Sequence, residues 1–532
     1  MEITQFHAHC FSLFFLSFLL FLDFLQSLSN GNDPVSRSLL LSLLLAWVTI
    51  HSSKSNKTTP TATPPPPPGP RGIPLFGNLL SLEPELHSYF AGLAHIYGPI
   101  FKLRLGNKVG IVMSSPSMAR QVLKDQDVTF ANRDITEAGR AATYGGSDIA
   151  WSSYGPEWRM LRKVCALKLL SNITLDSFYM LRRKHVRETA GYLYSRVGSP
   201  VNVGEQMFLT MLNLITNMLW GGTVEEDGAS ETAGYLYSRV GSPVNVGEQM
   251  FLTMLNLITN MLWGGTVEED GARLGADFRE VVLGMTELLG KPNISDFYPG
   301  LARFDLQGIR KKMDGLARRF DRIFDVMIDQ RLKIDQEGGS RESGSKDFLQ
   351  FLLKLKDEGD SNTPLTMIHL KALLMDMVVG GTDTSSHTIE FAMAEIMNKP
   401  EVMRKTQQEL EVVVGKDSIV EESHIHKLPY LYAFWENPLN FDPERFLKSK
   451  WDYSGSDFNY FPFGSGRRIC AGTAMAERMV MYSLATLLHS FDWKLPQGEK
   501  LDLIEKFGIV LKKKTALVAI PTPRLTDPSM YE

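Results

Sequence analysis

The chain has 532 residues, of which 44% are hydrophobic and 22% charged, an ordinary balance for a globular protein. This composition excludes a disordered chain and a transporter with many membrane spans. The net charge of −4 gives no basic surplus that would indicate a nucleic-acid partner. Only Cys10, Cys165 and Cys470 are present, which excludes a disulfide scaffold or a multi-cysteine zinc site and favours a reducing compartment. The length permits several average domains, or a leader followed by one α-rich domain of roughly 450 residues.

Two apolar runs, residues 10–22 and 39–50, lie near the N-terminus. Each is shorter than the ~20 residues that cross a bilayer. Residues 1–9 contain no Lys or Arg, which argues against a secretory signal peptide. More basic residues follow the second run than precede it, which places the later side in the cytoplasm. We therefore expect a membrane anchor within residues 1–53 and a cytosolic body; whether one run or both insert is open.

A proline-rich stretch follows the apolar runs. Residues 64–68 are five consecutive prolines, and Gly69-Pro70-Arg71-Gly72 comes directly after them. Consecutive prolines form a stiff polyproline II segment that cannot continue a helix. This predicts a hinge over residues 54–72 that either sets the spacing between anchor and body or is a passive linker, and a domain over residues 73–532.

The body is predicted to be mainly α with small β-sheets at its edges. Apolar residues recur at helical spacing in several segments, and short β-like runs lie near the start and the end. The expected helices cover residues 349–355, 368–379 and 404–414, and the expected strands cover residues 100–105, 109–113, 509–512 and 516–520.

Two segments, 188–229 and 231–272, are identical over 42 residues. Natural solenoid repeats diverge and usually number three or more, so two perfect copies indicate a recent duplication or an error of gene assembly. Each copy contains an apolar, helix-like stretch, 208–220 or 251–263. Because protein interiors are close-packed, the second stretch must be looped out, exposed or exchanged with the first.

The most specific pattern is Phe-x-x-Gly-x-Arg-x-Cys-x-Gly from Phe463 to Gly472. Its glycines let the backbone bend sharply and approach a flat partner. A helix-like run follows the cysteine, and a thiolate is favoured at a helix N-terminus. A buried structural cysteine is the alternative, but five fixed positions make a chance match improbable. The residues singled out are Phe463, Gly464, Gly466, Arg468, Cys470 and Gly472.

This segment resembles the haem-binding loop of the cytochrome P450 family, the haem-thiolate monooxygenases. The resemblance implies the fold of that family, haem b as cofactor and O2 as co-substrate. It makes Cys470 the axial thiolate ligand of the iron, Arg468 a partner of a haem propionate and Phe463 a residue packed beside the sulfur. A thiolate ligand pushes electron density onto iron and favours O–O cleavage.

Three further segments resemble marks of the same family. Gly380–Ser385 is similar to the oxygen-activation segment of its long central helix, which makes Asp383 and Thr384 the residues that pass protons. A helix end or loop is the alternative for this segment. Trp158 and Arg162, one helical turn apart, resemble a pair that holds a propionate. The segment containing Arg445 resembles the Pro-Glu-Arg-Phe element near haem, and together with the hinge it indicates the plant microsomal type.

One element of the family is missing. Its Glu-x-x-Arg motif, which pairs with the residue corresponding to Arg445, has only two matches here, Glu137/Arg140 and Glu401/Arg404, and we interpret both as chance surface pairs. Family spacing implies that tens of residues are absent near 433–435. Arg445 then lacks its carboxylate, and an unpaired buried charge costs several kcal/mol of a stability of about 5–15 kcal/mol. We therefore expect this chain to bind haem poorly or not at all.

The resemblance implies a monooxygenase that inserts one oxygen atom into a small apolar plant metabolite. Electrons would come from NADPH through a flavoprotein reductase, docked near Lys163 and Arg467, at the cytosolic face of the endoplasmic reticulum membrane. Substrate contacts are expected from residues 132–154, 375–381 and 507–511. The alternative is an inactive pseudoenzyme or the product of a faulty gene assembly.

Overall fold

The computed structural model describes residues 65–220, 270–336, 348–358, 363–432 and 454–531. These residues form two compact units, one within 1–82 and 100–112 and the other within 83–99 and 113–532. The predicted anchor, the second copy of the repeat up to residue 269, the predicted deletion near 433–435 and Arg445 lie outside the described residues. Among the described residues, no helix is both long and apolar enough to cross a membrane.

The smaller unit is a two-stranded sheet of β1 (Ile100–Leu105) and β2 (Lys108–Met113), preceded by a short 3-10 turn, η1 (Leu79–Ser81). Both strands agree with the predicted ones. The end of the predicted hinge joins this unit, because the amide of Lys102 donates to the carbonyl oxygen of Pro68 at 2.7 Å. A Cβ atom at Gly69 would lie 2.0 Å from the Lys102 carbonyl oxygen, so only glycine fits beside β1 there.

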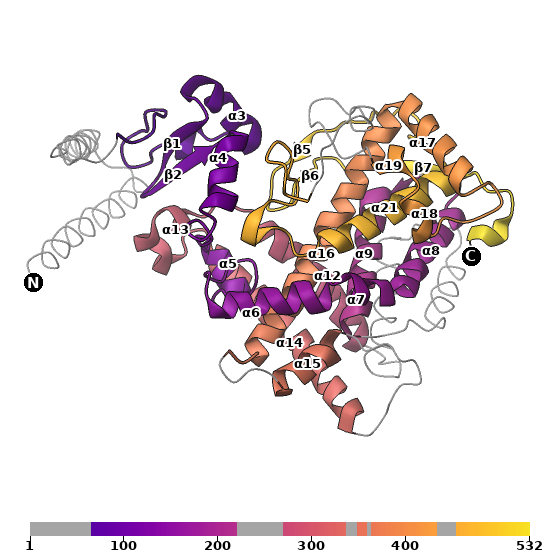
Figure 1. The fold of residues 1–532 in the computed structure, drawn as a ribbon, viewed down its shortest axis with the longest axis horizontal. Coiled ribbons are helices and arrows are strands. Elements are labelled where there is room, and N and C mark those ends of the chain that lie inside the picture. Colours follow the sequence, from indigo (N-terminus) through magenta and orange to yellow (C-terminus); the bar gives the residue numbers. More distant parts are fainter. Residues whose placement is uncertain (1–64, 221–269, 337–347, 359–362, 433–453, 532) are drawn as a thin grey trace, which may run out of the picture. The chain divides into compact units, whose positions relative to one another are not determined.

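The larger unit is mainly helical, as predicted (Figure 1). Side-chain N-caps begin several of the helices; the side chain of Thr366, for example, caps α16 by accepting from the amide of His369. The helices are α3 (Leu86–Tyr97), α4 (Pro116–Arg120), α5 (Glu137–Ala142), α6 (Pro156–Val164), α7 (Asn172–Ser177), α8 (Tyr179–Ser195), α9 (Val203–Trp220), α12 (Asp270–Leu289), α13 (Ile294–Phe297), α14 (Ile309–Gln336), α15 (Phe348–Glu358), α16 (Met367–Asn398), α17 (Pro400–Val413), α18 (Glu422–Ile425), α19 (Pro429–Tyr432) and α21 (Thr473–Ser490).

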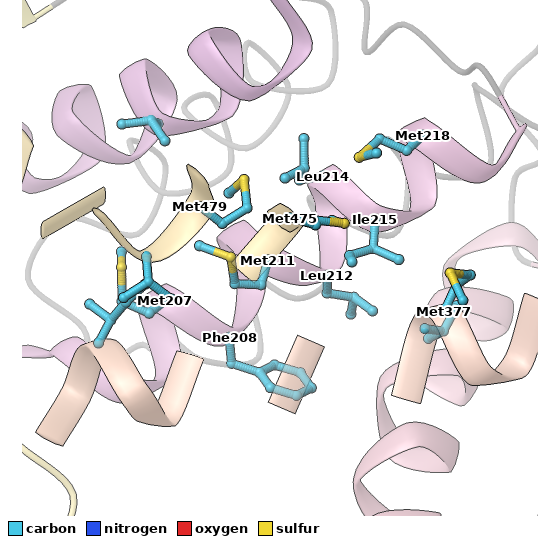
Figure 2. Close-up of a cluster of buried hydrophobic side chains, with 14 of the residues drawn as sticks. Met207, Phe208, Met211, Leu212, Leu214, Ile215, Met218, Met377, Met475 and Met479 are labelled. Atoms are coloured by element: carbon cyan, nitrogen blue, oxygen red, sulfur yellow. The ribbon is translucent and has the colours of Figure 1, made fainter. Parts of the chain in front are cut away.

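The core of this unit forms where α9 and α21 pack against α16, which runs through its middle (Figure 1). Figure 2 shows the methionine-rich contact, in which Met207 and Met211 of α9 lie near Met475 and Met479 of α21. Flexible thioether side chains fill irregular gaps between packed helices well. The helix α9 is built from the first copy of the repeat, so the helix predicted at 208–220 is confirmed.

Small sheets lie at the C-terminal end of the chain. The strands β3 (Val201–Asn202), β7 (Val518–Pro523) and β4 (Phe491–Lys494) form one antiparallel sheet, with Trp493 opposite Pro521. The strands β5 (Glu505–Lys506) and β6 (Lys512–Lys513) form a second. The strand predicted at 516–520 is shifted toward the C-terminus, and the one predicted at 509–512 is wrong except at its last residue, because pairing partners rather than β-branched composition define such short strands.

Candidate active site

The loop that carries Cys470 is shaped by two left-handed glycines and a short 3-10 turn, η6 (Gly466–Arg468). Gly464 and Gly466 have φ values of 75° and 67°, a conformation that side chains disfavour. A Cβ atom at Gly466 would lie 1.8 Å from the carbonyl oxygen of Leu123. The Cys470 amide donates to the carbonyl oxygen of Phe463 at 2.9 Å, which closes the loop.

Cys470 is a free, exposed thiol just before the first turn of α21. Gly472 lies at the N-cap of that helix, and a Cβ atom there would be 3.9 Å from the Cys470 sulfur. Helix N-termini favour an anionic sulfur, because their amide groups and the helix dipole stabilise negative charge. The other described cysteine, Cys165, is buried, and burial raises its pKa to about 12. Cys470 is therefore the described cysteine suited to ligate a metal.

Arg468 holds the cysteine loop against the segment before α6. Its Nε, Nη1 and Nη2 atoms donate to the carbonyl oxygens of Ala131, Ile149 and Ser152 at 2.9, 3.0 and 2.6 Å. A guanidinium carries five N–H donors, so donors remain for an anion. All three hydrogen bonds of Arg468 in this structure go to backbone carbonyl oxygens. Its remaining N–H groups are available for the carboxylate that it is expected from the sequence to bind.

Trp158 and Arg162 lie on α6, as their spacing predicted. The indole of Trp158 is buried and donates to the carbonyl oxygen of Ile149 at 3.1 Å. Burial lowers the pKa of Arg162, and the sulfurs of Cys165 and Cys470 oppose this shift, which places Arg162 within electrostatic range of Cys470. The structure therefore brings Trp158, Arg162, Arg468 and Cys470 together.

A third arginine, Arg133, completes a positively charged cluster; the sequence places it only within the stretch 132–154 expected to contact substrate, not among the propionate partners. Its Nη1 atom donates to the carbonyl oxygen of Ala150 at 2.9 Å. Burial and repulsion from Arg133 and Arg162 lower the pKa of Arg468 to about 10, against the attraction of Asp148, which raises it. Three arginines at one place, facing few acids, form a site for an anionic group such as a carboxylate. No motif in the sequence marks Arg133, because the chain fold alone brings it there.

The segment Gly380–Ser385 is continuous helix within α16, so the alternative of a helix end is excluded. The hydroxyl of Thr384 donates to the carbonyl oxygen of Gly380 at 2.6 Å, the i−4 bond that a threonine in a helix can make. Gly381 packs closely against α9, since a Cβ atom there would lie 2.3 Å from Cδ1 of Ile215. Thr384 is exposed and the adjacent Asp383 is fully buried, so the two side chains lie on different faces of the helix.

Asp383 is held by two cations. Nζ of Lys512 lies 2.9 Å from its carboxylate, and Nε2 of His387 lies 3.2 Å from it. Burial would raise the pKa of Asp383, but the bonds from His387 and Lys512 outweigh burial and lower it. Burial would likewise lower the pKa of His387, but Asp383 and Glu390 raise it. The sequence did not predict His387 or Lys512 as partners of this acid.

The remaining predicted positions are more scattered. Phe463 is half-buried in the cysteine loop. Lys163 and Arg467 are exposed, and Nε of Arg467 lies 2.8 Å from a carboxylate oxygen of Asp127. Of residues 507–511, Phe507, Ile509 and Leu511 are exposed.

Neither Glu-x-x-Arg match forms the buried pair of the family's motif. Arg140 lies 3.8 Å from Glu137 and is exposed, and Glu137 also binds Arg310 at 3.0 Å. Glu401 and Arg404 are both exposed on α17, where Arg404 donates to Gln408. Both arginines lie at the surface, and of the two matches Glu137/Arg140 forms an ion pair, as expected of chance matches outside a buried charge network.

Comparison with known proteins places these features in a family. The sequence model described as cytochrome P450 matches residues 67–234, 227–434 and 432–520. The first break in the match falls inside the duplicated segment, and the second falls where residues are predicted to be missing. The fold matches a solved zebra fish cytochrome P450, in a structure with abiraterone, with a TM-score of 0.60 and 19% identity over 82% of this chain and 99% of that one.

Curated relatives come from plants. The chain is 33% identical to cytochrome P450 monooxygenase 76AD131 of Lophophora williamsii, over 89% of this chain and 97% of the relative. It is 34% identical to flavonoid 3',5'-hydroxylase CYP75B138 of Crocosmia x crocosmiiflora, over 87% and 92%. It is 32% identical to geraniol 8-hydroxylase of Swertia mussotii, over 86% and 93%.

Proposed function

Since this chain belongs to the cytochrome P450 family of monooxygenases, we propose that it inserts one atom of O2 into a small apolar plant metabolite and reduces the other to water. The observation that carries the proposal is the free Cys470 at the start of α21, beside a cluster of three arginines. A thiolate ligand and an anion-binding cluster side by side are the requirements for holding a haem with propionate groups.

The residues present fit haem b. Cys470 would ligate the iron, with Phe463 packed beside the sulfur, while Gly464, Gly466 and Gly472 keep the loop narrow enough for a flat ring to approach. Arg133, Arg162, Arg468 and Trp158 would hold the propionates. The unused N–H donors of Arg468 and the lowered pKa values of Arg162 and Arg468 support this, because an anion would offset the repulsion within the cluster. When bound, haem supplies the activation of O2.

Asp383 and Thr384 of α16 are the proposed proton-holding residues. The Thr384 hydroxyl is exposed, and its bond to Gly380 orients it. The Asp383 carboxylate is stabilised in its charged form by Lys512 and His387. Because the two side chains lie on different faces of α16, each would hold a proton separately, Thr384 on the exposed face and Asp383 on the buried one.

Electrons come, in this proposal, from NADPH through a flavoprotein reductase, with exposed Lys163 and Arg467 as docking residues. The anchor over 1–53 and the hinge over 54–72 would hold the catalytic domain, 73–532, at the cytosolic face of the endoplasmic reticulum. Relatives named for flavonoids and geraniol support an aromatic or terpenoid substrate, contacted by residues 132–154, 375–381 and 507–511.

An inactive descendant of such an enzyme is the second candidate, favoured by the missing Glu-x-x-Arg helix. The break in the family match at 432–434 supports a deletion there, and the overlap at 227–234 accompanies the perfect repeat. If that helix is missing, Arg445 would lack the carboxylate partner that the family resemblance implies, and a buried charge left unpaired costs several kcal/mol.

Two measurements separate the candidates. The full chain in microsomal membranes is reduced and exposed to carbon monoxide, and the Soret band diagnostic of thiolate ligation is recorded, with Cys470→Ser as the negative control and Cys165→Ala as the matched cysteine variant. A band that Cys470→Ser alone abolishes supports the enzyme; its absence in the unaltered chain supports the inactive descendant. Sequencing the transcript across 188–272 and 428–443 then shows whether a single copy and a restored motif exist.

A further inference from the structure

The backbone of one residue, Ile149, connects the central helix to Arg468. The amide of Ile149 donates to Oδ2 of Asp376 on α16 at 2.9 Å. The carbonyl oxygen of the same residue accepts from Nη1 of Arg468 at 3.0 Å and from Nε1 of Trp158 at 3.1 Å. Any displacement of Ile149 from α16 would therefore move the groups that bind Arg468 and Trp158.

Asp148, the residue before Ile149, is buried, and both its side chain and its backbone carbonyl group accept hydrogen bonds. Its Oδ1 atom accepts from the amide of Trp151 at 2.8 Å, and its carbonyl oxygen accepts from the hydroxyl of Ser152 at 2.5 Å. Its carboxyl group lies next to that of Asp376, because the following amide, that of Ile149, donates to Asp376, and the two carboxyl groups shift each other's pKa. Two neighbouring carboxyl groups repel each other when both are ionised, whereas one proton between them lets one group donate a hydrogen bond to the other.

We propose that Asp148 and Asp376 share one proton and that this acid pair positions Ile149, and through it Arg468 and Trp158. Both aspartates are positioning residues, because they act on the anion-binding cluster through the backbone of 148–152. The inference goes beyond the proposed reaction and does not depend on turnover.

The charged surroundings agree with a protonated pair. Among the described residues, no Lys, Arg or His forms an ion pair with either carboxyl group. Burial raises the pKa of Asp376 well above its ordinary value, and the neighbouring Asp148 adds to this. The opposing group is Arg133, whose donor goes to the carbonyl oxygen of Ala150 instead.

The remaining ionisable neighbours do not reverse this direction. Burial raises the pKa of Asp148 as well, against its own backbone hydrogen bonds. The charge of Asp148 raises the pKa of Arg468 and so opposes the lowering by burial. The charge of Asp376 adds to burial in raising the pKa of the Cys165 thiol.

The linkage has a definite sign. A carboxyl group whose pKa is higher in the folded state binds its proton more tightly when folded. The pair's contribution to stability is therefore full at a pH below the ordinary carboxyl pKa, and it declines as the pH rises through the raised pKa of the pair. The contact between 148–152 and α16 should loosen in the same direction.

Asp376→Asn is the informative variant, because its amide mimics the protonated acid. Its oxygen can accept from Ile149, and its NH2 group can donate to the Asp148 carboxylate at every pH. Asp376→Ala removes both bonds. Glu395→Gln is the matched control, since Glu395 lies on the same helix and burial raises its pKa, but it lies outside this contact.

Thermal unfolding of the full chain is followed from about pH 5 to about pH 8, the range in which a carboxyl group with a raised pKa loses its proton. We expect the unfolding midpoint of the unaltered chain to fall relative to that of Asp376→Asn as the pH rises. The same midpoint difference is expected when both chains also carry Glu395→Gln. An infrared difference spectrum between the unaltered chain and Asp376→Asn should show the C=O stretch of a carboxylic acid.

Hydrogen exchange of a peptide covering 145–155 tests the positioning. It should be faster in Asp376→Ala than in Asp376→Asn. Parallel pH profiles for the unaltered chain and Asp376→Asn, or a spectrum without the acid band, would overturn the shared proton. Equal exchange in the two variants would overturn the positioning role. If Asp376→Ala does not fold, exchange in Asp148→Ala decides the same point. None of these readouts requires substrate, reductase or haem, so failure here is distinguishable from failure of the proposed reaction.

Discussion

The guanidinium group of Arg468 lies 4.5 Å from the centre of the Trp158 ring, and both side chains donate to the same carbonyl oxygen, that of Ile149. A cation stacked on an indole gains electrostatic attraction that increases when water is excluded. The stacking and the shared acceptor together tie the cysteine loop to α6, although these segments lie far apart in the sequence.

Replacing Arg468 should destabilise this junction more than replacing its neighbour. Arg468→Ala leaves the carbonyl oxygens of Ala131 and Ser152 without their side-chain donor, and we expect a loss of about 2–3 kcal/mol in the free energy of unfolding. Arg467→Ala is the control, because it removes an exposed ion pair with Asp127 worth about 1 kcal/mol or less. Denaturant unfolding measures both, and equal losses would contradict the central role of Arg468.

The two copies of the repeat should respond differently to the same substitution. Ile215 is buried in α9 against Gly381, so Ile215→Asp should cost about 3–5 kcal/mol by burying an unpaired charge. Ile258→Asp changes the identical position of the second copy and is the matched control. Thermal unfolding compares the two single variants with the double variant. If both single variants are stable and only the double variant unfolds, either copy can form α9, and the structure describes one of two arrangements.

The bond network of Asp383 predicts a pH-dependent effect of His387. The folded state raises the pKa of His387, so its stabilising contribution is full below about pH 6.5 and is lost as the pH rises through the raised value. His387→Gln should therefore lower stability by about 1–2 kcal/mol near pH 6, and by less at higher pH. Unfolding midpoints across this pH range test this. A loss of stability in His387→Gln that does not shrink as the pH rises would refute the assignment.

Gly466 combines two constraints that can be separated. Its φ is 67°, and a Cβ atom would also collide with the Leu123 carbonyl oxygen. Gly498 has a φ of 85° with open space around it. Gly498→Ala should cost about 1–2 kcal/mol, the conformational term alone. Gly466→Ala should cost clearly more and displace the cysteine loop, which unfolding and the reactivity of the Cys470 thiol would report. Equal costs would show that the loop can shift away from Leu123.

Local patterns predicted much of the fold. The segments predicted at 349–355 and 368–379 lie within α15 and α16, and the one at 404–414 runs one residue past the end of α17. An amphipathic helix can be predicted locally because it needs only one apolar face to bury. The strands at 100–105 and 109–113 were equally visible, since they form a local hairpin. The edge strands near the C-terminus were not, because their extent depends on partners distant in the chain.

The sequence by itself determined the family, through the spacing around Cys470, the segment at Gly380–Ser385 and the helix of Trp158 and Arg162. These marks are local, because each requires specific residues within one loop or one or two helical turns. Only the tertiary structure decided which distant groups meet them, such as Arg133 beside Arg468 or Asp148 against Asp376. The physical reason is that burial and charge proximity are properties of the packed chain: a carboxyl group acquires a raised pKa, and an arginine a lowered one, only where folding removes water and brings charged groups together.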